Sequence, residues 1–198
     1  MNTNITLKYY DQNAQDYYLK TNTANTSSII NTFSSYLKPG SLILDFGCGS
    51  GRDSKLFIEK GFKVEAIDGS KEMCKLAEKN IGISVKQMSF NELDDNMKYD
   101  GIWACASILH LCRADLIIVL RKISKALKEE GVVYISFKYG EKEGFIDNRY
   151  YIYLTENSLK NIIANIPSLS IMTLWKSSDV LSNRSTKWLN AILKKDTL

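Results

Sequence analysis

The stretch LILDFGCGSGRDS, residues 42–54, decides the fold. An apolar segment ends at Asp45, glycines occupy every second position from Gly47 to Gly51, and a segment of helical spacing begins near Arg52. Glycine accepts positive φ angles and lets backbone amides approach a ligand, and the helix that follows has a partly positive N-terminus. We therefore expect a small polar ligand to bind over this turn, outside the carboxyl end of a strand.

Short apolar runs alternate with segments of helical spacing on both sides of this turn. The apolar runs lie at 41–46, 63–68, 83–88, 99–106 and 132–139, and the helical segments lie at 52–60, 70–80 and 114–128. Buried strands that alternate with helices are typical of βαβ units, in which helices cover both faces of a parallel sheet. The alternation predicts an α/β fold.

The two ends of the chain depart from this alternation. Apolar and aromatic residues at helical spacing predict helices over 5–20 and 29–37, the second of which stops before Pro39 and Gly40. After residue 140 we expect, in order, a charged loop at 141–148, an aromatic patch at 149–153, a helix capped by Thr155, and an antiparallel hairpin formed by 169–175 and 186–193.

Length and composition describe an ordinary globular protein. At roughly 150 residues per domain, 198 residues give about 1.3 domains, so we expect a single domain over 1–198. Hydrophobic residues make up 44% and charged residues 24%, and the net charge of +4 permits a nucleic-acid partner without indicating one. Because no apolar run reaches about 18 residues and MNTNITLKYY lacks the features of a signal peptide, we expect a cytoplasmic protein without a membrane partner, as a monomer or homodimer.

The cysteines argue against a metal centre. Cys48, Cys74, Cys105 and Cys112 form no CxxC pair, and only one histidine is present to complete a site. We expect no metal, and we expect Cys48 and Cys105 to be small buried residues rather than nucleophiles.

The acidic residues around the glycine turn narrow the choice of ligand. A dinucleotide fingerprint needs glycine where Arg52 stands, and the Gly-Lys-Ser/Thr of a Walker loop is absent. Asp45 lies two residues before the first glycine, where a carboxylate repels phosphate and attracts an ammonium group. The second predicted strand ends at Asp68, whose two oxygens can accept both hydroxyls of a ribose. The pattern favours a nucleoside that carries a positive charge.

Three motifs in the expected order resemble those of the class I S-adenosylmethionine-dependent methyltransferases of the small-molecule type. They are LDFGCGSG at 44–51, AIDGSKEM at 66–73 and YDGIWACASILHL at 99–111, and the resemblance covers about residues 9–139. It implies a Rossmann-like three-layer α/β/α sandwich with a seven-stranded, mostly parallel sheet of order 3-2-1-4-5-7-6, in which strand seven is antiparallel. It also implies S-adenosyl-L-methionine as the cofactor.

The resemblance also implies a division of the chain and a set of cofactor contacts. It makes residues 1–38 lid helices, 41–139 the cofactor-binding core, and 140–198 a loop, helix and hairpin on the substrate side. The amino-acid end of the cofactor would lie over Asp45 and the glycines, its ribose at Asp68, and its adenine near Met73 and Phe90. The full set of implied contacts is Tyr17, Asp45, Gly47, Cys48, Gly49, Arg52, Asp68, Gly69, Ser70, Met73, Phe90, Asn91 and Ala104.

One position departs from the family pattern. The loop at 88–93 often holds an acidic residue that contacts the adenine amine, and here it offers Ser89, Phe90 and Asn91. Phe90 can pack against the adenine ring instead.

The catalytic and substrate residues follow from the same comparison. His110 lies in the region that faces the methyl group in this family, which makes it the candidate general base; the alternative is a histidine that fills a hydrogen bond at the turn. The expected substrate contacts are Tyr10, Tyr139, Arg149, Arg184 and Trp188. The two arginines suggest an anionic group on the substrate.

Three functions stay open on the sequence alone. The first is methyl transfer to a small-molecule acceptor by in-line displacement, which the compact chain and lid-like first helix favour. The second is modification of a macromolecule such as tRNA, DNA or a protein. The third is nucleotide binding without catalysis, or an NAD-dependent oxidoreductase.

Overall fold

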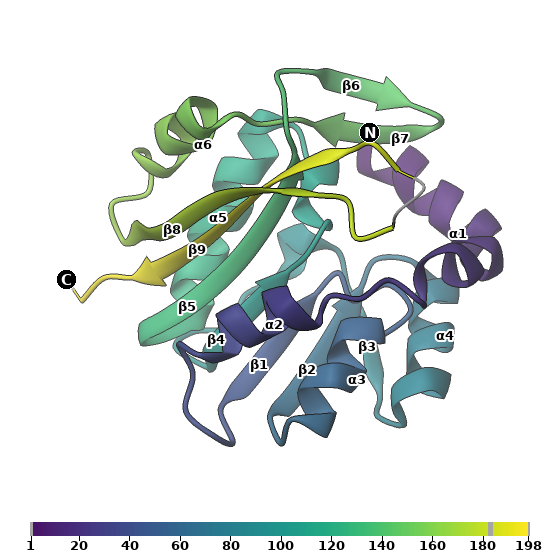
Figure 1. Cartoon of the computed structure of the whole chain (residues 1–198), viewed down its shortest axis with the longest axis horizontal. Coiled ribbons are helices and arrows are strands. Elements are labelled where there is room, and N and C mark those ends of the chain that lie inside the picture. Colours follow the sequence, from purple (N-terminus) through teal and green to yellow (C-terminus); the bar gives the residue numbers. More distant parts are fainter. Residues whose placement is uncertain (1, 182–183, 198) are drawn as a thin grey trace.

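A computed structural model describes residues 2–181 and 184–197 of the chain (Figure 1). Its helices are α1 (Asn2–Thr21), α2 (Ser27–Ser34), α3 (Arg52–Glu59), α4 (Lys71–Ile81), α5 (Arg113–Ala126) and α6 (Glu156–Ile163), with short 3-10 turns η1 (Phe90–Glu92) and η2 (Ile108–His110). Its strands are β1 (Leu42–Phe46), β2 (Lys63–Asp68), β3 (Val85–Gln87), β4 (Tyr99–Ala104), β5 (Leu127–Lys138), β6 (Glu143–Ile146), β7 (Arg149–Ile152), β8 (Leu169–Ser178) and β9 (Lys187–Lys195).

Seven strands form one sheet in the order β3-β2-β1-β4-β5-β9-β8. The five strands from β3 to β5 pair in parallel, whereas β9 runs antiparallel to both β5 and β8. Numbered within this sheet alone, the order is 3-2-1-4-5-7-6 with strand seven antiparallel. The predicted sheet order is therefore confirmed.

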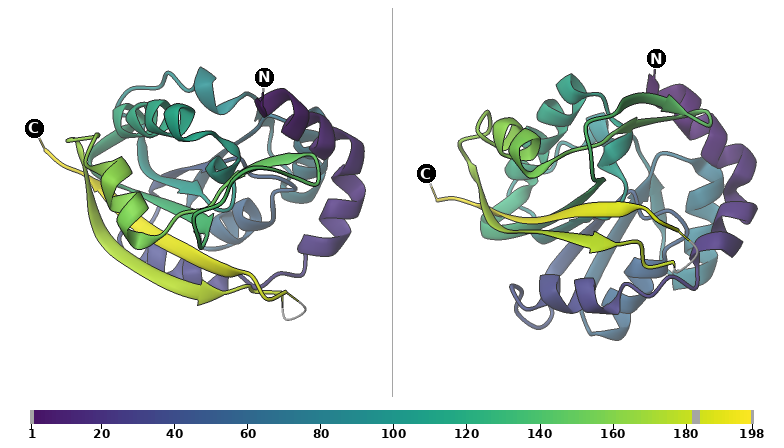
Figure 2. Two further views of the ribbon diagram at one scale, coloured as in Figure 1. Left: turned by 90° about the horizontal axis from the view of Figure 1, so that it is seen from above. Right: turned by 45° about the horizontal axis from the view of Figure 1, so that its top comes forward.

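Both faces of the sheet are buried, as the apolar strand sequences predict. Along β4, Ile102 and Ala104 belong to the cluster that includes Leu116 and Leu120 of α5, whereas Trp103 between them belongs to the cluster of α2 and α3. Alternate side chains of a strand point to opposite faces, so one strand contributes to both cores. The α5 and α6 layer, the sheet, and the α2 and α3 layer make a three-layer sandwich (Figures 1 and 2).

The segment 141–148 is not wholly a loop, and this prediction was wrong. Residues 143–146 form β6, which pairs with β7 in a separate two-stranded hairpin. The two residues between the strands, Asp147 and Asn148, have φ angles of +47° and +60°. Asp and Asn tolerate this conformation, and two such residues make the tight turn that suits a hairpin. The polar composition of residues 141–148 is typical of a loop, so the sequence did not indicate β6.

The remaining C-terminal predictions are confirmed. Thr155 caps α6 by accepting a hydrogen bond from the Ser158 backbone amide, and β8 and β9 form the antiparallel hairpin that closes the sheet edge. Among the described residues, no helix combines the length and the apolar character needed to cross a membrane.

Helix α1 runs along one side of the carboxyl ends of the parallel strands, next to α4 (Figures 1 and 2). The Asp11 carboxylate on α1 accepts hydrogen bonds from the Ser70 hydroxyl at 2.7 Å and the Glu72 backbone amide at 3.2 Å. On the other side, the Thr6 hydroxyl accepts a hydrogen bond from the backbone amide of Tyr150 in β7 at 2.9 Å. These bonds fasten α1 to the start of α4 and to the hairpin, so it covers the space over the strand ends.

Candidate active site

A cavity of about 470 Å³ lies between α1 and the carboxyl ends of the parallel strands. This volume falls within the range of small-molecule and cofactor sites. Most of the sequence-predicted site residues line it: Tyr10, Tyr17, Asp45, Gly47, Cys48, Gly49, Arg52, Asp68, Gly69, Met73, Phe90, His110, Arg149, Arg184 and Trp188. The fold thus brings together residues from most of the chain's length.

Four predicted site residues do not line the cavity. Ser70 is buried at the N-cap of α4, where its hydroxyl accepts a hydrogen bond from the Met73 backbone amide. Ala104 is fully buried in the core at the end of β4, and Asn91 is exposed on η1. Tyr139 faces Lys176, whose ammonium nitrogen lies 4.8 Å from the ring centroid. A direct ligand contact from any of these side chains requires a rearrangement.

The glycines of the turn differ in what surrounds them. Gly47 has φ +86°, and a Cβ there would lie 2.6 Å from the Cβ of Ser107. Gly49 has φ +56°, and a Cβ there would meet nothing within 4 Å. Gly47 is therefore required for close packing between the turn and the β4–α5 connection, whereas Gly49 borders open space within the cavity.

Asp68 fastens the turn to the end of β2. One carboxylate oxygen accepts a hydrogen bond from the Gly49 backbone amide at 2.9 Å, and the other accepts one from the Ser70 backbone amide at 2.8 Å. Burial raises the pKa of Asp68, and these backbone hydrogen bonds oppose that rise. Each oxygen keeps a further lone pair, so the carboxylate can still accept two hydroxyl groups.

Asp45 is a buried residue whose carboxyl group lines the cavity near Asp68. Its Oδ2 accepts a hydrogen bond from the Ser54 hydroxyl at 2.6 Å. Burial, followed by the negative charge of Asp53, raises the pKa of Asp45 to about 7. Among the described residues Asp45 forms no ion pair, so a cationic ligand group is what would stabilise its charged form.

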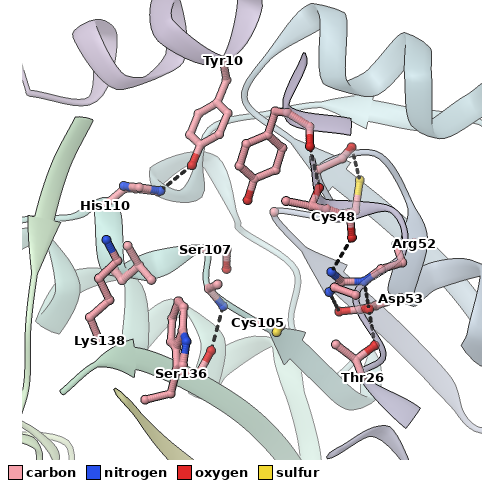
Figure 3. A pocket seen from close by; sticks show the side chains of 18 of the residues that line it. Tyr10, Thr26, Cys48, Arg52, Asp53, Cys105, Ser107, His110, Ser136 and Lys138 are labelled. Carbon is pink, nitrogen blue, oxygen red and sulfur yellow. Dashed lines mark hydrogen bonds and ion pairs between the residues drawn. The ribbon is translucent and has the colours of Figure 1, made fainter. Parts of the chain in front are cut away.

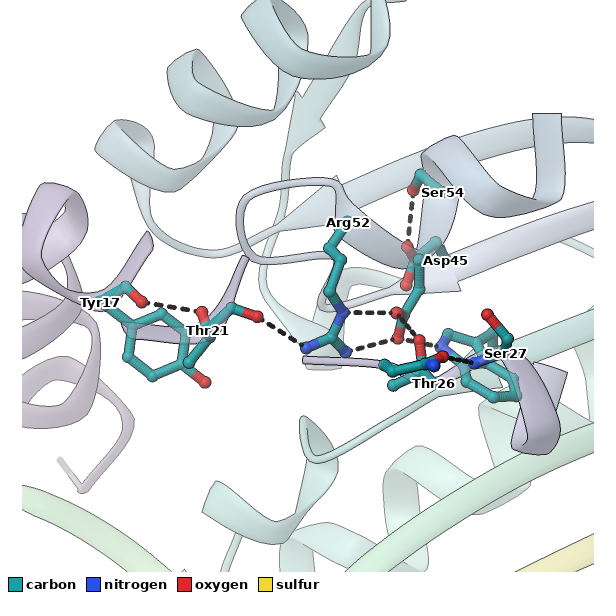
Figure 4. A network of polar contacts seen from close by, with 10 residues as sticks. Tyr17, Thr21, Thr26, Ser27, Asp45, Arg52 and Ser54 are labelled. Atoms are coloured by element: carbon teal, nitrogen blue, oxygen red, sulfur yellow. Dashed lines mark hydrogen bonds and ion pairs between the residues drawn. The ribbon is translucent and has the colours of Figure 1, made fainter. Parts of the chain in front are cut away.

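Arg52 forms an ion pair and hydrogen bonds beside the glycine turn (Figures 3 and 4). Its guanidinium donates to both carboxylate oxygens of Asp53, at 2.7 and 3.0 Å, and to the Thr21 backbone carbonyl at 3.2 Å. Asp53 also accepts hydrogen bonds from the Thr26 hydroxyl and the Trp103 indole. Burial alone would raise the pKa of Asp53, but Arg52 and these donors lower it below its ordinary value. The positive charge of Arg52 is thus already neutralised.

His110 joins α1, η2 and the hairpin. Its Nδ1 lies 2.7 Å from the Tyr150 backbone carbonyl, which can only accept, so Nδ1 carries the proton. Its Nε2 therefore accepts the hydrogen bond from the Tyr10 hydroxyl at 2.8 Å (Figure 3). Burial, opposed by the Tyr150 hydrogen bond and assisted by Arg149 and Lys138, lowers the pKa of His110 to about 4. The ring is neutral at pH 7, and both nitrogens are occupied.

Asp53, Lys138 and Ser107 are among the lining residues that the sequence reasoning did not single out. Asp53 directly follows Arg52 at the start of α3, and its position beside the glycine turn is the signal that could have found it. Lys138 ends β5, where a charge after a long apolar strand marks the ligand edge of the sheet. Ser107 had no signal in the sequence; its buried hydroxyl has no hydrogen-bond partner among the described residues.

The remaining polar chemistry of the cavity is limited. All four cysteines are free, and burial raises the pKa of both Cys48 and Cys105, so neither thiol is activated. No group of three or more His, Cys, Asp or Glu side chains suited to a metal ion occurs within 2–181 and 184–197. The titratable side chains that line the cavity include His110, Lys138, Tyr10, Tyr17 and the carboxylates.

The sheet order and the site at the strand ends define a class I, Rossmann-like methyltransferase fold. Residues 43–131 match the family model described as a methyltransferase domain.

A curated relative and two solved structures are similar to the chain. The "Putative methyltransferase YqeM" of Bacillus subtilis (strain 168) is 32% identical over 110 residues, which are 50% of this chain and 44% of that protein. The chain thus spans less than half the length of this relative.

Both solved structures are similar over nearly the whole chain. The Burkholderia thailandensis 1,6-didemethyltoxoflavin-N1-methyltransferase, with bound 1,6-didemethyltoxoflavin and S-adenosylhomocysteine, has a TM-score of 0.79 at 20% identity, covering 98% of this chain and 89% of that one. The magnesium protoporphyrin IX methyltransferase of Synechocystis PCC 6803, with bound S-adenosylmethionine, has a TM-score of 0.76 at 15% identity, covering 99% of this chain and 98% of that one. At these identities the likeness shows the fold.

Proposed function

We propose that the protein is an S-adenosylmethionine-dependent methyltransferase that acts on a small-molecule acceptor. The observation that carries the proposal is the pair of carboxyl groups beside the glycine turn. Asp45 and Asp68 line one end of the cavity, and Asp45 has a pKa near 7 and no cationic partner among the described residues. Such an end suits a nucleoside with positive charge and does not suit a pyrophosphate.

The residues at this end fit the proposed cofactor. Asp68 would accept the ribose hydroxyls with its remaining lone pairs, and Asp45 and the open face of Gly49 would hold the ammonium group of the amino-acid end. Phe90 and Met73 would border the adenine, and Tyr17 would cover the cofactor from α1. When bound, the cofactor supplies a methyl group on a sulfonium sulfur, and the electron pair of the broken carbon–sulfur bond stays on that sulfur.

The protein's contribution to transfer is mainly alignment and exclusion of water. Helix α1 covers the cavity, and its hydrogen bonds to α4 and β7 hold it closed. A hydroxyl or ammonium acceptor must also lose a proton. His110 stays the proposed base, but it can take that proton only through the Tyr10 hydroxyl or after Tyr10 moves away, because Tyr10 occupies Nε2.

We favour a small-molecule acceptor because helix α1 covers the cavity. Tyr10, Tyr17 and Leu7 of α1 line the cavity, so an acceptor has to fit beneath the helix. In this proposal residues 1–38 act as the lid, 41–139 hold the cofactor, and 140–198 contribute acceptor contacts such as Arg149, Arg184 and Trp188.

The test is transfer of a tritium-labelled methyl group from S-adenosylmethionine into a cell extract divided by size into small molecules and macromolecules. We expect label in the small-molecule fraction with the wild type and with Asp16→Asn, whose carboxyl group is exposed on α1 and does not line the cavity. Asp68→Ala should abolish most of the transfer. Label confined to RNA, DNA or protein would replace the small acceptor by a macromolecule, and no label in either fraction together with no cofactor binding would refute the proposal.

A further inference from the structure

Two cations share one aromatic ring at the end of the cavity away from Asp45 and Asp68. The Lys138 ammonium lies 3.9 Å from the centroid of the Tyr151 ring, and the Arg149 guanidinium carbon lies 5.4 Å from the same centroid. Arg149 also lies over the Tyr9 ring, at 4.4 Å. These distances are typical of cation–π contacts, so the rings hold both charges in place.

Neither cation has a negative partner in the part of the chain that is described. Within residues 2–181 and 184–197, no carboxylate forms an ion pair with Lys138 or Arg149, and the Nε of Arg149 is buried without a hydrogen-bond partner. Arg52, on the opposite side of the cavity, is fully paired with Asp53. The carboxylate of Asp179 is engaged elsewhere, since it accepts hydrogen bonds from the Trp188 indole and the Leu181 backbone amide.

This arrangement is costly for the free protein. Burial lowers the pKa of Lys138, and the positive charges of Arg149 and Arg184 lower it further. A buried N–H group without a partner and two like charges beside one ring both oppose folding. An anion between the two cations would offset the repulsion.

The position of this cluster suits an acceptor rather than the cofactor. Lys138 ends β5 and Asp45 lies near the end of β1, and β4 is the only strand between them. With a strand spacing of about 4.8 Å, the two strand ends are offset by roughly 10 Å along the sheet edge. Figure 3 shows Ser107, whose hydroxyl has no hydrogen-bond partner among the described residues, between Lys138 and Arg52, and the Tyr10–His110 pair on the Lys138 side.

We propose that the acceptor carries an anionic group, a carboxylate or a phosphate, which Arg149 and Lys138 bind while Tyr9 and Tyr151 contact its apolar part. This inference rests on the proposed methyltransferase function. Arginine binds both kinds of anion through paired N–H donors, and Arg149 lines the cavity without an ion-pair partner among the described residues. Arg184 lines the same cavity and adds positive charge nearby.

The experiment measures binding of matched ligand pairs by calorimetry to protein saturated with S-adenosylhomocysteine. The pairs are benzoate and benzamide, indole-3-acetate and indole-3-acetamide, and phenyl phosphate and phenol. We expect the wild type to bind at least one anion at least about tenfold more tightly than its neutral partner. The carboxylate and phosphate arms then distinguish the two kinds of anion.

Variants test where the anion binds. Arg149→Gln and Lys138→Gln should each remove most of that preference, whereas Arg121→Gln, which removes an exposed arginine outside the cavity, should keep it. Each variant is made separately, so that one remains informative if the other fails to fold. A variant that still binds S-adenosylhomocysteine is folded.

The outcomes separate this inference from the proposed function. Normal S-adenosylhomocysteine binding with no preference for any anion, or with a preference unchanged in both folded variants, would overturn the anionic acceptor and leave the methyltransferase in place. Absence of S-adenosylhomocysteine binding by the wild type would overturn the proposed function itself.

Discussion

The two ends of the cavity carry opposite charge. At the ends of β1 and β2 the lining groups are carboxyls, and the one arginine there is neutralised by Asp53. At the end of β5 and the start of β7 the lining groups include Lys138 and Arg149, and the described residues supply neither with an ion-pair partner. The difference indicates two ligand parts of opposite charge, a cationic cofactor end and an anionic acceptor.

The largest expected effect comes from filling the glycine turn at the acidic end. Gly47→Ala places a Cβ 2.6 Å from Ser107 in a left-handed conformation, so we expect a loss of about 2–4 kcal/mol in the free energy of unfolding, measured by urea denaturation. Gly61→Ala is the matched control, because its φ of +83° is similar but its Cβ would meet nothing within 4 Å. It should cost only about 1–2 kcal/mol. Equal losses would show that the packing against Ser107 is unimportant.

Removing the carboxylate of β2 should have the next largest effect. Asp68→Ala leaves the backbone amides of Gly49 and Ser70 without acceptors and removes the proposed ribose contact. We expect S-adenosylmethionine affinity, measured by calorimetry, to fall tenfold to a hundredfold, about 1.5–3 kcal/mol. The exposed Asp16→Asn should change it by less than about twofold, and a similar small change in Asp68→Ala would remove the ribose assignment.

The pH dependence of binding tests the charge of Asp45. Because its pKa is about 7, the carboxyl is largely neutral below that pH and ionised above it, so attraction to a cation grows as pH rises. We expect S-adenosylmethionine affinity to increase about tenfold from about pH 6 to about pH 8. Asp45→Asn is the control, because ionisation of the ligand itself changes its affinity for both proteins equally. An equal rise of affinity with pH in the wild type and in Asp45→Asn would contradict the role of Asp45.

A smaller effect is expected at the hydrogen bond between Tyr10 and His110. Tyr10→Phe removes one neutral hydrogen bond to His110, which should cost about 1 kcal/mol of unfolding free energy and leave S-adenosylmethionine affinity within about twofold. Transfer to a hydroxyl or amine acceptor should slow more than binding if protons pass through Tyr10. Tyr36→Phe, which loses an exposed hydrogen bond to Thr173, is the control.

The acidic end could be predicted from the sequence, and much of the cationic end could not. Asp45 and the glycines are contiguous, and Asp68 ends the next strand, so a local pattern reports their proximity. Lys138, Arg149 and Tyr151 meet only because the β6–β7 hairpin folds beside the end of β5. A polar segment with a hidden two-residue turn gave no indication of that hairpin.

The state of His110 shows a second limit of sequence reasoning. Its place after β4 suggested a base that titrates near neutral pH. Its pKa near 4 and its two hydrogen bonds depend on Tyr10 and Tyr150, which lie far away in the chain and approach it only in the folded protein. The core of alternating strands and helices, in contrast, depends on periodicities that each segment carries by itself.

The most direct test of the account is calorimetric titration of the wild type with S-adenosylmethionine and, in a parallel titration, with NAD. An acidic cavity end predicts a micromolar dissociation constant for the positively charged S-adenosylmethionine and no measurable binding of the pyrophosphate-containing NAD. Binding of NAD, or absence of S-adenosylmethionine binding by the folded protein, would contradict the assignment of the acidic end to a cationic cofactor.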